Sequence, residues 1–206
     1  MFNDRAHAGS LLAQKLPQKR DSFLVVLGLA RGGVVVAGSV ADKLGVPFDL
    51  LVVKKIPSPE NSELAMGAVA PDSVSYMDWQ LAQRVGVDEH YVKLQITNLN
   101  VQIKQKNHLY RKGRLPLVVK GKTVIVVDDG AATGATMQAA VIWLKKKKAA
   151  KIIIGLPVAP AGFVEKIKRE VDELVVLETP RDFFSVGQFY NNFPQVSDNE
   201  VIELLQ

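Results

Sequence analysis

The segment Val124-Ile-Val-Val-Asp-Asp-Gly-Ala-Ala-Thr-Gly-Ala-Thr136 decides the fold of this chain. It joins four β-branched apolar residues to two adjacent acids and then to a run of Gly, Ala and Thr. A short apolar run without polar alternation is typical of a strand buried on both faces of a parallel sheet. Small residues let the backbone approach a ligand closely, and amides at the start of a helix bind phosphate. The segment therefore predicts a strand, a phosphate-binding loop and a helix in succession.

The polar groups of this segment are of two kinds: some suit an anion, and others suit hydroxyl groups or a cation. We expect the amides of Ala131 to Thr136 and the hydroxyls of Thr133 and Thr136 to donate to a phosphate. The carboxylates of Asp128 and Asp129 would repel a phosphate, so we expect them to meet neutral hydroxyls or a bound cation. A ribose that carries a 5-phosphate offers both partners. The spacing matches neither the Walker A loop nor the Gly-x-Gly-x-x-Gly dinucleotide turn.

Other apolar runs of the same kind surround this strand, and helix-like stretches connect some of them. The predicted strands are Phe23 to Leu29, Phe48 to Val53, Thr123 to Val127, Lys151 to Val158 and Leu174 to Leu177. The predicted helices between them are Gly33 to Leu44, which ends at Gly45, and Ala135 to Lys147. Buried strands that alternate with helices predict right-handed βαβ units. The predicted fold class is therefore α/β with a parallel sheet.

One long segment, Pro57 to Pro116, interrupts this alternation. It begins with the loop-like sequence Pro57-Ser-Pro-Glu-Asn-Ser62 and leads into the apolar run Ala65 to Val69. The stretch Gln80 to Arg111 has the pattern of one long helix. We interpret the segment as an insertion that contains a mobile loop or hairpin and a helix.

The tail after Thr179 is a second irregular segment and is rich in aromatic residues. Its end, Ser197 to Leu205, predicts a short helix in which Ser197 is the N-cap and Glu200 completes a capping box. Irregular segments of this length in a compact domain are typical of lids and binding loops. We expect residues 1–206 to form a single domain.

Composition and charge exclude several classes of function. The chain has 206 residues and no cysteine, which excludes disulfides, thiolate metal sites and a Cys nucleophile. No apolar run approaches the roughly 20 residues that span a bilayer, so we expect a cytoplasmic protein without membrane partners. Between His90 and Val127 there are eight Lys or Arg residues and no acid. This run is either a solvated basic face or a surface that meets phosphates of a ligand or nucleic acid.

Two motifs carry a resemblance to a known family. The segment from Val124 to Thr136 resembles the 5-phosphoribosyl 1-diphosphate (PRPP) motif of type I phosphoribosyltransferases. The sequence Leu29-Ala-Arg-Gly-Gly33 is similar to the pyrophosphate loop of that family. Over nearly its full length, from Phe2 to Glu200, the chain resembles a group of bacterial and archaeal phosphoribosyltransferases. The resemblance implies a Rossmann-like parallel-sheet core, a flexible-loop insertion at about 57–116 and a C-terminal hood at about 179–206 that includes the N-terminal segment.

The resemblance also implies roles for individual residues. Catalysis would depend on Asp128, Asp129 and Arg31. The ribose and its 5-phosphate would bind at Asp128, Asp129, Gly130, Ala131, Ala132, Thr133, Gly134, Ala135 and Thr136. Pyrophosphate would bind at Ala30, Arg31, Gly32, Gly33, Lys54 and Lys55, and the basic loop of Arg111, Lys112 and Arg114 would close on it. Phe189 and Tyr190 are candidates to stack on a base in a pocket lined by Val158 and Ala159, with core packing as the alternative and more common role for any one of these aromatic residues. Mg²⁺ would be held by Asp128 and Asp129, directly or through water.

Two departures from the family pattern bear on the substrate and the loop. Ala132 stands where 6-oxopurine enzymes have an Asp that handles the purine N7 proton, so we expect PRPP and a nucleobase other than a 6-oxopurine as substrates. Ala30 stands where the related group often has Pro. Two alternatives stay open: a PRPP-sensing regulator that binds nucleic acid through the basic insertion, and a transferase that uses an amine or phosphate acceptor. We favour the enzyme, and we expect a homodimer because this fold commonly pairs.

Overall fold

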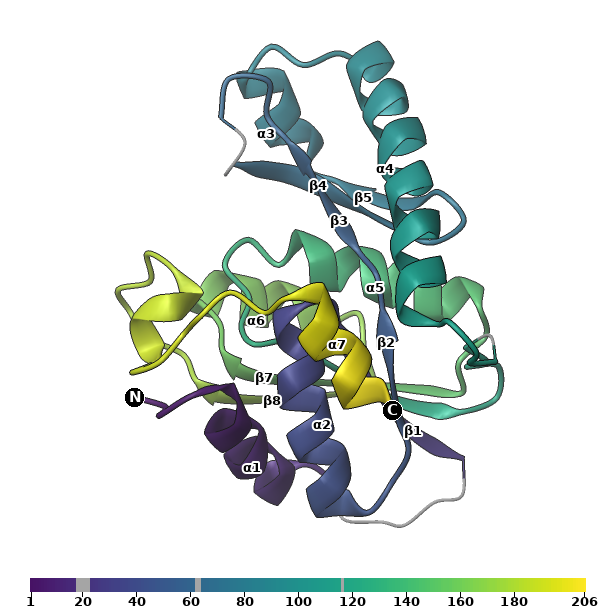
Figure 1. The fold of residues 1–206 in the computed structure, drawn as a ribbon. Coiled ribbons are helices and arrows are strands. Elements are labelled where there is room, and N and C mark those ends of the chain that lie inside the picture. The colour runs from purple at the N-terminus through teal and green to yellow at the C-terminus, as the bar shows by residue number, and fades with distance from the viewer. Residues whose placement is uncertain (18–22, 62–63, 116) are drawn as a thin grey trace.

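A five-stranded parallel sheet forms the core of the computed structural model, which describes residues 1–17, 23–61, 64–115 and 117–206 (Figure 1). The strand order is β2-β1-β6-β7-β8, and every neighbouring pair is parallel. The strands are β1 (Leu24–Leu29), β2 (Phe48–Leu51), β6 (Thr123–Val127), β7 (Lys151–Val158) and β8 (Glu173–Glu178). The predicted α/β class is confirmed, and each predicted strand is present within one to two residues of its expected ends.

The pairing of β1 with β6 positions the two sequence motifs. In their register Gly28 pairs with Val127, so both strands reach their carboxyl ends at the same level of the sheet. The loop after Leu29 and the acids after Val127 therefore meet at one edge. In open parallel sheets, ligands bind in the crevice outside the carboxyl ends of the strands.

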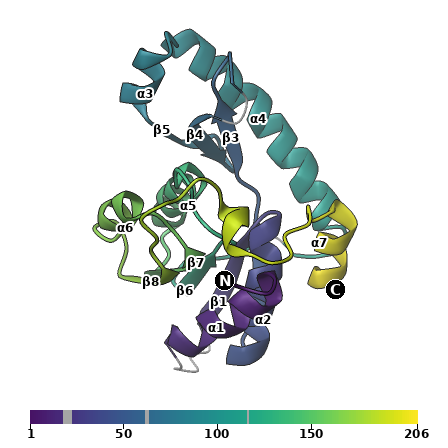
Figure 2. The ribbon, with the colours of Figure 1, turned by 90° about the vertical axis from the view of Figure 1, so that its left-hand side faces the viewer.

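Helices cover both faces of this sheet (Figure 2). On one face α1 (Arg5–Lys15) and α2 (Gly32–Leu44) pack on β1, β6 and β7 through an apolar cluster that includes Leu12 and Ile125. On the other face lie α5 (Ala135–Lys146) and α6 (Ala161–Ile167). Helices α2 and α5 were predicted, whereas α1 was not. Asp4 caps α1 by accepting a hydrogen bond from the His7 amide.

The insertion forms a second, antiparallel sheet of three strands in the order β3-β4-β5, followed by two helices. Its elements are β3 (Lys54–Pro57), β4 (Ala65–Ala70), β5 (Val74–Met77), α3 (Trp79–Arg84) and α4 (Glu89–Tyr110). The prediction of a single helix over Gln80 to Arg111 was wrong. Gly86, with φ of +70°, has left-handed backbone that ends the first helix, and Asp88 then caps α4. Residues 62, 63 and 116, which fall within the predicted insertion, lie outside the described residues.

Helix α5 lies between the two sheets and joins them. Ala68 and Ala70 of β4 share one apolar cluster with Met137 of α5 and with Val126 of the main sheet. The insertion thus stands over the carboxyl edge of the main sheet (Figure 1), and α4 runs from it toward the C-terminal helix.

The C-terminal segment returns across the sheet edge to meet the N-terminus. It contains a short 3₁₀ helix, Val186–Phe189, and α7 (Asp198–Leu205). The predicted capping box of Ser197 and Glu200 is present. Phe2 donates its amide to the carbonyl of Phe189 and accepts from the amide of Asn191, both at 2.8 Å. The two chain ends therefore form one layer beside the sheet.

Candidate functional site

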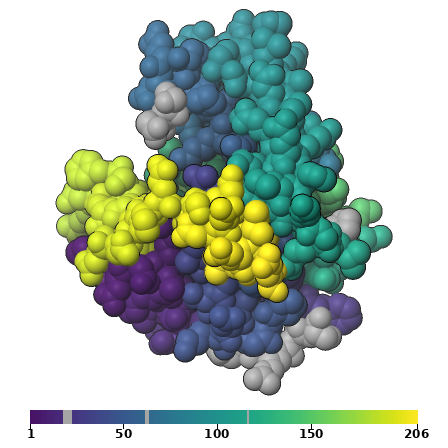
Figure 3. Space-filling model, in the orientation of Figure 1, coloured from purple at the N-terminus to yellow at the C-terminus, as the bar shows by residue number. Residues whose placement is uncertain are grey.

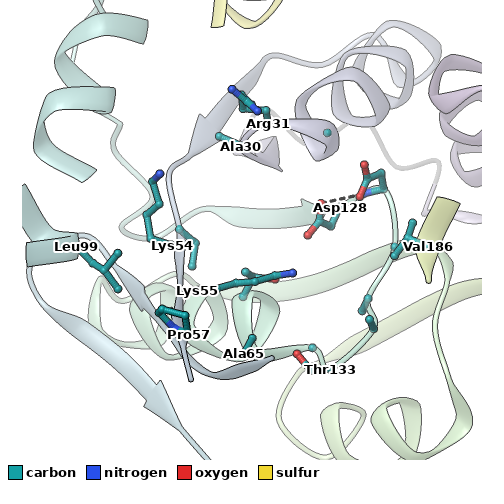
Figure 4. Close-up of a pocket in the computed structure, with 18 of the residues that line it drawn as sticks. Ala30, Arg31, Lys54, Lys55, Pro57, Ala65, Leu99, Asp128, Thr133 and Val186 are labelled. Atoms are coloured by element: carbon teal, nitrogen blue, oxygen red, sulfur yellow. Dashed lines mark hydrogen bonds between the residues drawn. The ribbon is translucent and has the colours of Figure 1, made fainter. Parts of the chain in front are cut away.

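A cavity of about 680 Å³ lies at the carboxyl ends of β1 and β6, below the insertion (Figure 4). It brings together most of the predicted ribose, phosphate and pyrophosphate residues. These are Ala30, Arg31, Gly32, Lys54, Lys55, Asp128, Asp129, Gly130, Ala131, Ala132, Thr133, Gly134 and Thr136. Gly33 and Ala135 do not line it. The remaining wall includes residues that the sequence did not single out: Gln95, Leu99 and Gln102 of α4, and Val186 of the C-terminal segment.

The loop between β6 and α5 presents free backbone donors to this cavity. Among the described residues, the amides of Ala132, Thr133 and Gly134 have no hydrogen-bond acceptor. The Ala131 amide, which we predicted would bind phosphate, instead donates to the Val158 carbonyl at 3.0 Å. Gly134 has φ of +72°, and a Cβ there would lie 2.0 Å from the Phe163 ring. Glycine is thus required where the loop turns into α5, and the turn leaves adjacent amides available to an anion.

The start of α2 packs directly on the two acids. A Cβ on Gly32 would lie 1.9 Å from Oδ2 of Asp129, and a Cβ on Gly33 would lie 2.9 Å from Cα of Asp128. The preceding peptide bond, between Ala30 and Arg31, is cis. Two glycines in succession therefore allow the loop after β1 to lie against the acids.

Asp129 is held by residues from both ends of the chain. Nε of Arg5 donates to Oδ2 of Asp129 at 2.7 Å, and both side chains are largely buried. The Tyr190 hydroxyl donates to the Asp129 carbonyl at 2.6 Å. Arg5 also donates to the Pro194 carbonyl at 2.7 Å and lies 3.7 Å above the Phe193 ring. Arg5 was not among the predicted site residues, although it lies in the N-terminal stretch that carries the resemblance.

Asp128 has a strongly perturbed acidity. Burial, and then the negative charge of Asp129, raise the pKa of Asp128 well above its ordinary value. The Asp129 amide, which donates to Oδ1 of Asp128 at 2.9 Å, and the charge of Lys55 act in the opposite direction. Strongly shifted carboxyl groups in a cleft are typical of functional sites.

Three cations line the same cavity, and the Lys55 side chain extends toward Asp128 (Figure 4). Arg31 follows β1, while Lys54 and Lys55 begin β3 of the small sheet, rather than ending β2 as the sequence suggested (Figure 4). Arg111, expected in a closing loop, is instead paired with Asp49 at 2.8 Å and donates to the Leu50 carbonyl at 2.9 Å. Lys112 and Arg114 do not line the cavity. The cavity wall therefore combines free amides, cations and two acids.

The family assignment rests on a match along most of the chain. The model of the phosphoribosyl transferase domain matches residues 3–190. The chain belongs to this family. The assignment confirms the resemblance that the two motifs indicated, and it agrees with the observed parallel-sheet fold.

The chain is also similar to individual known proteins. A Mycobacterium tuberculosis protein named "Putative phosphoribosyl transferase Rv0571c" is 38% identical over 205 residues, covering 100% of this chain and 46% of that protein. The chain therefore spans about half the length of this relative. The crystal structure of TT1426 from Thermus thermophilus is 37% identical, with a TM-score of 0.81, and the match covers 99% of this chain and 97% of that one. A ribose-phosphate pyrophosphokinase of Pyrococcus furiosus is 31% identical over 136 residues, covering 64% of this chain and 46% of that enzyme.

The residues predicted to hold a base do not line the cavity. Val158 and Ala159 are completely buried, and Phe189 and Tyr190 are 9% and 5% exposed. Tyr190 packs between Phe2 and Phe193, with ring centroids 5.3 and 4.8 Å away. In this phosphoribosyl transferase fold, Val186 is the residue of the described C-terminal segment that lines the cavity.

The two acids do not form a complete Mg²⁺ site by themselves. They would hold the ion only when a phosphate ligand supplies further oxygen atoms. Across residues 1–17, 23–61, 64–115 and 117–206, no group of three or more His, Cys, Asp or Glu side chains could hold a metal. Oδ2 of Asp129 is already paired with Arg5. Mg²⁺ commonly binds through one or two carboxylates together with substrate phosphates and water. Asp128, aided by Asp129 through water, matches that pattern.

In the described part of the chain, no helix is both long enough and apolar enough to cross a membrane.

Proposed function

We propose that this chain transfers the 5-phosphoribosyl group of PRPP to a small acceptor and releases pyrophosphate. The distribution of charge in the cavity carries the proposal. Free amides of Ala132, Thr133 and Gly134 suit the 5-phosphate, and Asp128 suits the ribose hydroxyls. Arg31, Lys54 and Lys55 suit the diphosphate. Membership of the phosphoribosyl transferase family supports the same assignment.

The reaction requires stabilisation of two opposite charges. The bond between C1 of the ribose and the diphosphate oxygen breaks as the acceptor forms its bond to C1, so positive charge develops on the sugar as in glycoside cleavage. The carboxylates of Asp128 and Asp129 stabilise that charge, and Arg31 and the two lysines stabilise the departing diphosphate. Mg²⁺, when bound with PRPP, supplies further charge neutralisation on the diphosphate. No covalent nucleophile on the protein is needed.

The acceptor we propose is a nucleobase other than a 6-oxopurine. Ala132 is exposed at the cavity and supplies no carboxylate for a purine N7 proton. The nucleic-acid-binding regulator has less support, because several cations of the basic run are paired: Lys106 with Asp198, and Arg111 with Asp49. The cytoplasmic location and the homodimer stay predictions.

Calorimetric titration with PRPP, with and without Mg²⁺, tests the proposal. The Asp128→Asn, Asp129→Asn double variant is the control, and its circular dichroism spectrum shows whether it folds. We expect Mg²⁺-dependent binding by the natural chain that the double variant loses. A panel of nucleobases, amines and phosphate, assayed for pyrophosphate release, then identifies the acceptor. If the folded natural chain does not bind PRPP, the cavity belongs to another phosphorylated ligand.

A further inference from the structure

A second cavity, of about 280 Å³, adjoins the main one on the side of α4. We call it the side pocket. It shares four wall residues with the main cavity, Ala30, Arg31, Val53 and Lys54, and is completed by Val52, Lys106 and Tyr110. A group bound in the side pocket would therefore lie next to a ligand in the main cavity.

The polar side chains of the side pocket are all hydrogen-bond donors at neutral pH. Arg31 comes from the start of α2, Lys54 from β3 and Lys106 from α4, and no acidic residue lines the pocket. Burial and the neighbouring Asp198 raise the pKa of Tyr110, so its hydroxyl keeps its proton. Three cations and a phenol that converge on one small space suit a compact anion with several oxygen atoms.

A carboxylate of the protein itself contacts three of these four donors. Asp198 is the first residue of α7, which lies on the surface between α2 and α4 (Figure 3). Nζ of Lys106 donates to Oδ2 of Asp198, and the Tyr110 hydroxyl donates to Oδ1 at 2.5 Å. Nη1 of Arg31 lies 3.6 Å from the same Oδ1. Lys106 and then Tyr110 lower the pKa of Asp198, which keeps it charged at neutral pH.

We infer that the side pocket binds a phosphate-type anion, and that the Asp198 carboxylate competes with this anion for Lys106, Tyr110 and Arg31. The anion is either the terminal phosphate of a diphosphate in the main cavity or a separate inorganic phosphate. The first source rests on the proposed function, whereas the second does not. Under this inference, Lys106 is an anion-binding residue contributed by the insertion, and α7 moderates the affinity of the site.

Titration of inorganic diphosphate and of inorganic phosphate by calorimetry tests the pocket directly. Lys106→Gln removes a donor, and we expect it to weaken the binding of at least one of the two anions about tenfold, as for a charge-assisted hydrogen bond. Asp198→Asn removes the competing charge, and we expect it to strengthen that binding several-fold. Two controls remove the same charges without these contacts. They are Lys104→Gln, at an exposed position of α4, and Glu203→Gln, at an exposed position of α7. Both should change affinity less than about twofold, as expected for distant, solvent-screened charges.

Comparison of PRPP with ribose 5-phosphate separates the two sources of the anion. If Lys106→Gln weakens PRPP binding and leaves ribose 5-phosphate unchanged, the pocket takes the terminal phosphate of PRPP. If it weakens inorganic phosphate alone, the pocket takes a separate anion. The inference is overturned if Lys106→Gln and Asp198→Asn change anion affinity no more than the controls, because the ion pair is then only a tie between α4 and α7. A natural chain that binds diphosphate through Lys106 but does not bind PRPP would refute the proposed function alone.

Discussion

Nε of Arg5 donates a 2.7 Å hydrogen bond to Oδ2 of Asp129, which joins the first helix to the acidic pair across 124 positions of sequence. The Arg5 and Asp129 side chains are 9% and 15% exposed. Removing one member of such a pair leaves a charge that has lost most of its solvation and its partner.

We therefore expect Arg5→Gln to lower the free energy of unfolding by about 3 kcal/mol and to weaken PRPP binding, because Asp129 loses the partner that orients it. Urea denaturation and calorimetry measure the two effects. Arg84→Gln is the matched control, since Arg84 is exposed and makes only a 3.4 Å hydrogen bond to the Gln80 carbonyl. Equal stability of the two variants would contradict the role given to Arg5.

Gly32 and Gly38 lie on the same helix, but we expect substitution by alanine to have opposite effects at the two positions. A Cβ on Gly32 would lie 1.9 Å from Oδ2 of Asp129, whereas the nearest atom to a Cβ on Gly38 is 3.8 Å away, on the Phe48 ring. We expect Gly32→Ala to displace Asp129 and abolish PRPP binding. We expect Gly38→Ala to bind PRPP normally and to gain about 0.5–1 kcal/mol of stability from helix propensity. Normal PRPP affinity in Gly32→Ala would show that the acids tolerate displacement.

The raised pKa of Asp128 predicts that this residue reduces stability at neutral pH. The folded state holds the proton of Asp128 more tightly than the unfolded state, so stability falls as pH rises from the unfolded pKa of about 3.9 through the folded pKa. Asp128→Asn should therefore be more stable than the natural chain at pH 7, by about 1.4 kcal/mol for each unit of pKa increase. This gain should shrink as the pH falls and should disappear only below the unfolded pKa of about 3.9, where both states carry the proton.

Denaturation curves of Asp128→Asn between pH 4 and pH 8 measure this dependence. Asp42→Asn, on an exposed position of α2, is the control and should change stability by less than about 0.5 kcal/mol at every pH. A constant difference between Asp128→Asn and the natural chain across this range would contradict the prediction. The same variant should lose transferase activity, because under the proposed function Asp128 binds the ribose hydroxyls.

Tyr190 ties the C-terminal segment to the backbone of the acidic pair. Its hydroxyl donates to the Asp129 carbonyl at 2.6 Å, and the side chain is 5% exposed. Tyr190→Phe leaves that carbonyl without its partner, so we expect a loss of about 1–2 kcal/mol in unfolding free energy. Tyr76→Phe removes an exposed hydrogen bond to Lys166 and should cost less than about 0.5 kcal/mol. Thermal denaturation of both variants gives the comparison.

The sequence by itself determined the sheet and the identity of the two motifs. Runs such as Thr123 to Val127 are apolar at every position or nearly so, and such runs are stable only between two covering layers. The acids and glycines that follow are local features, so their order along the chain was sufficient to predict a phosphate site and the family. The capping box of Ser197 and Glu200 is local in the same way, and it was also predicted.

Only the tertiary structure decided which residues from distant segments meet at that site. No local pattern pairs Arg5 with Asp129 or Asp198 with Lys106, because those contacts depend on how the chain ends and the insertion pack against the sheet edge. Burial of the Tyr190 and Phe189 rings could likewise not be decided from the sequence, since an aromatic residue in an irregular tail fits a core as well as the wall of a binding pocket. The order of residues along the chain therefore specified the chemical groups of the site. Packing specified which side chains from distant segments contact those groups, because such contacts depend on how the layers assemble and not on spacing along the chain.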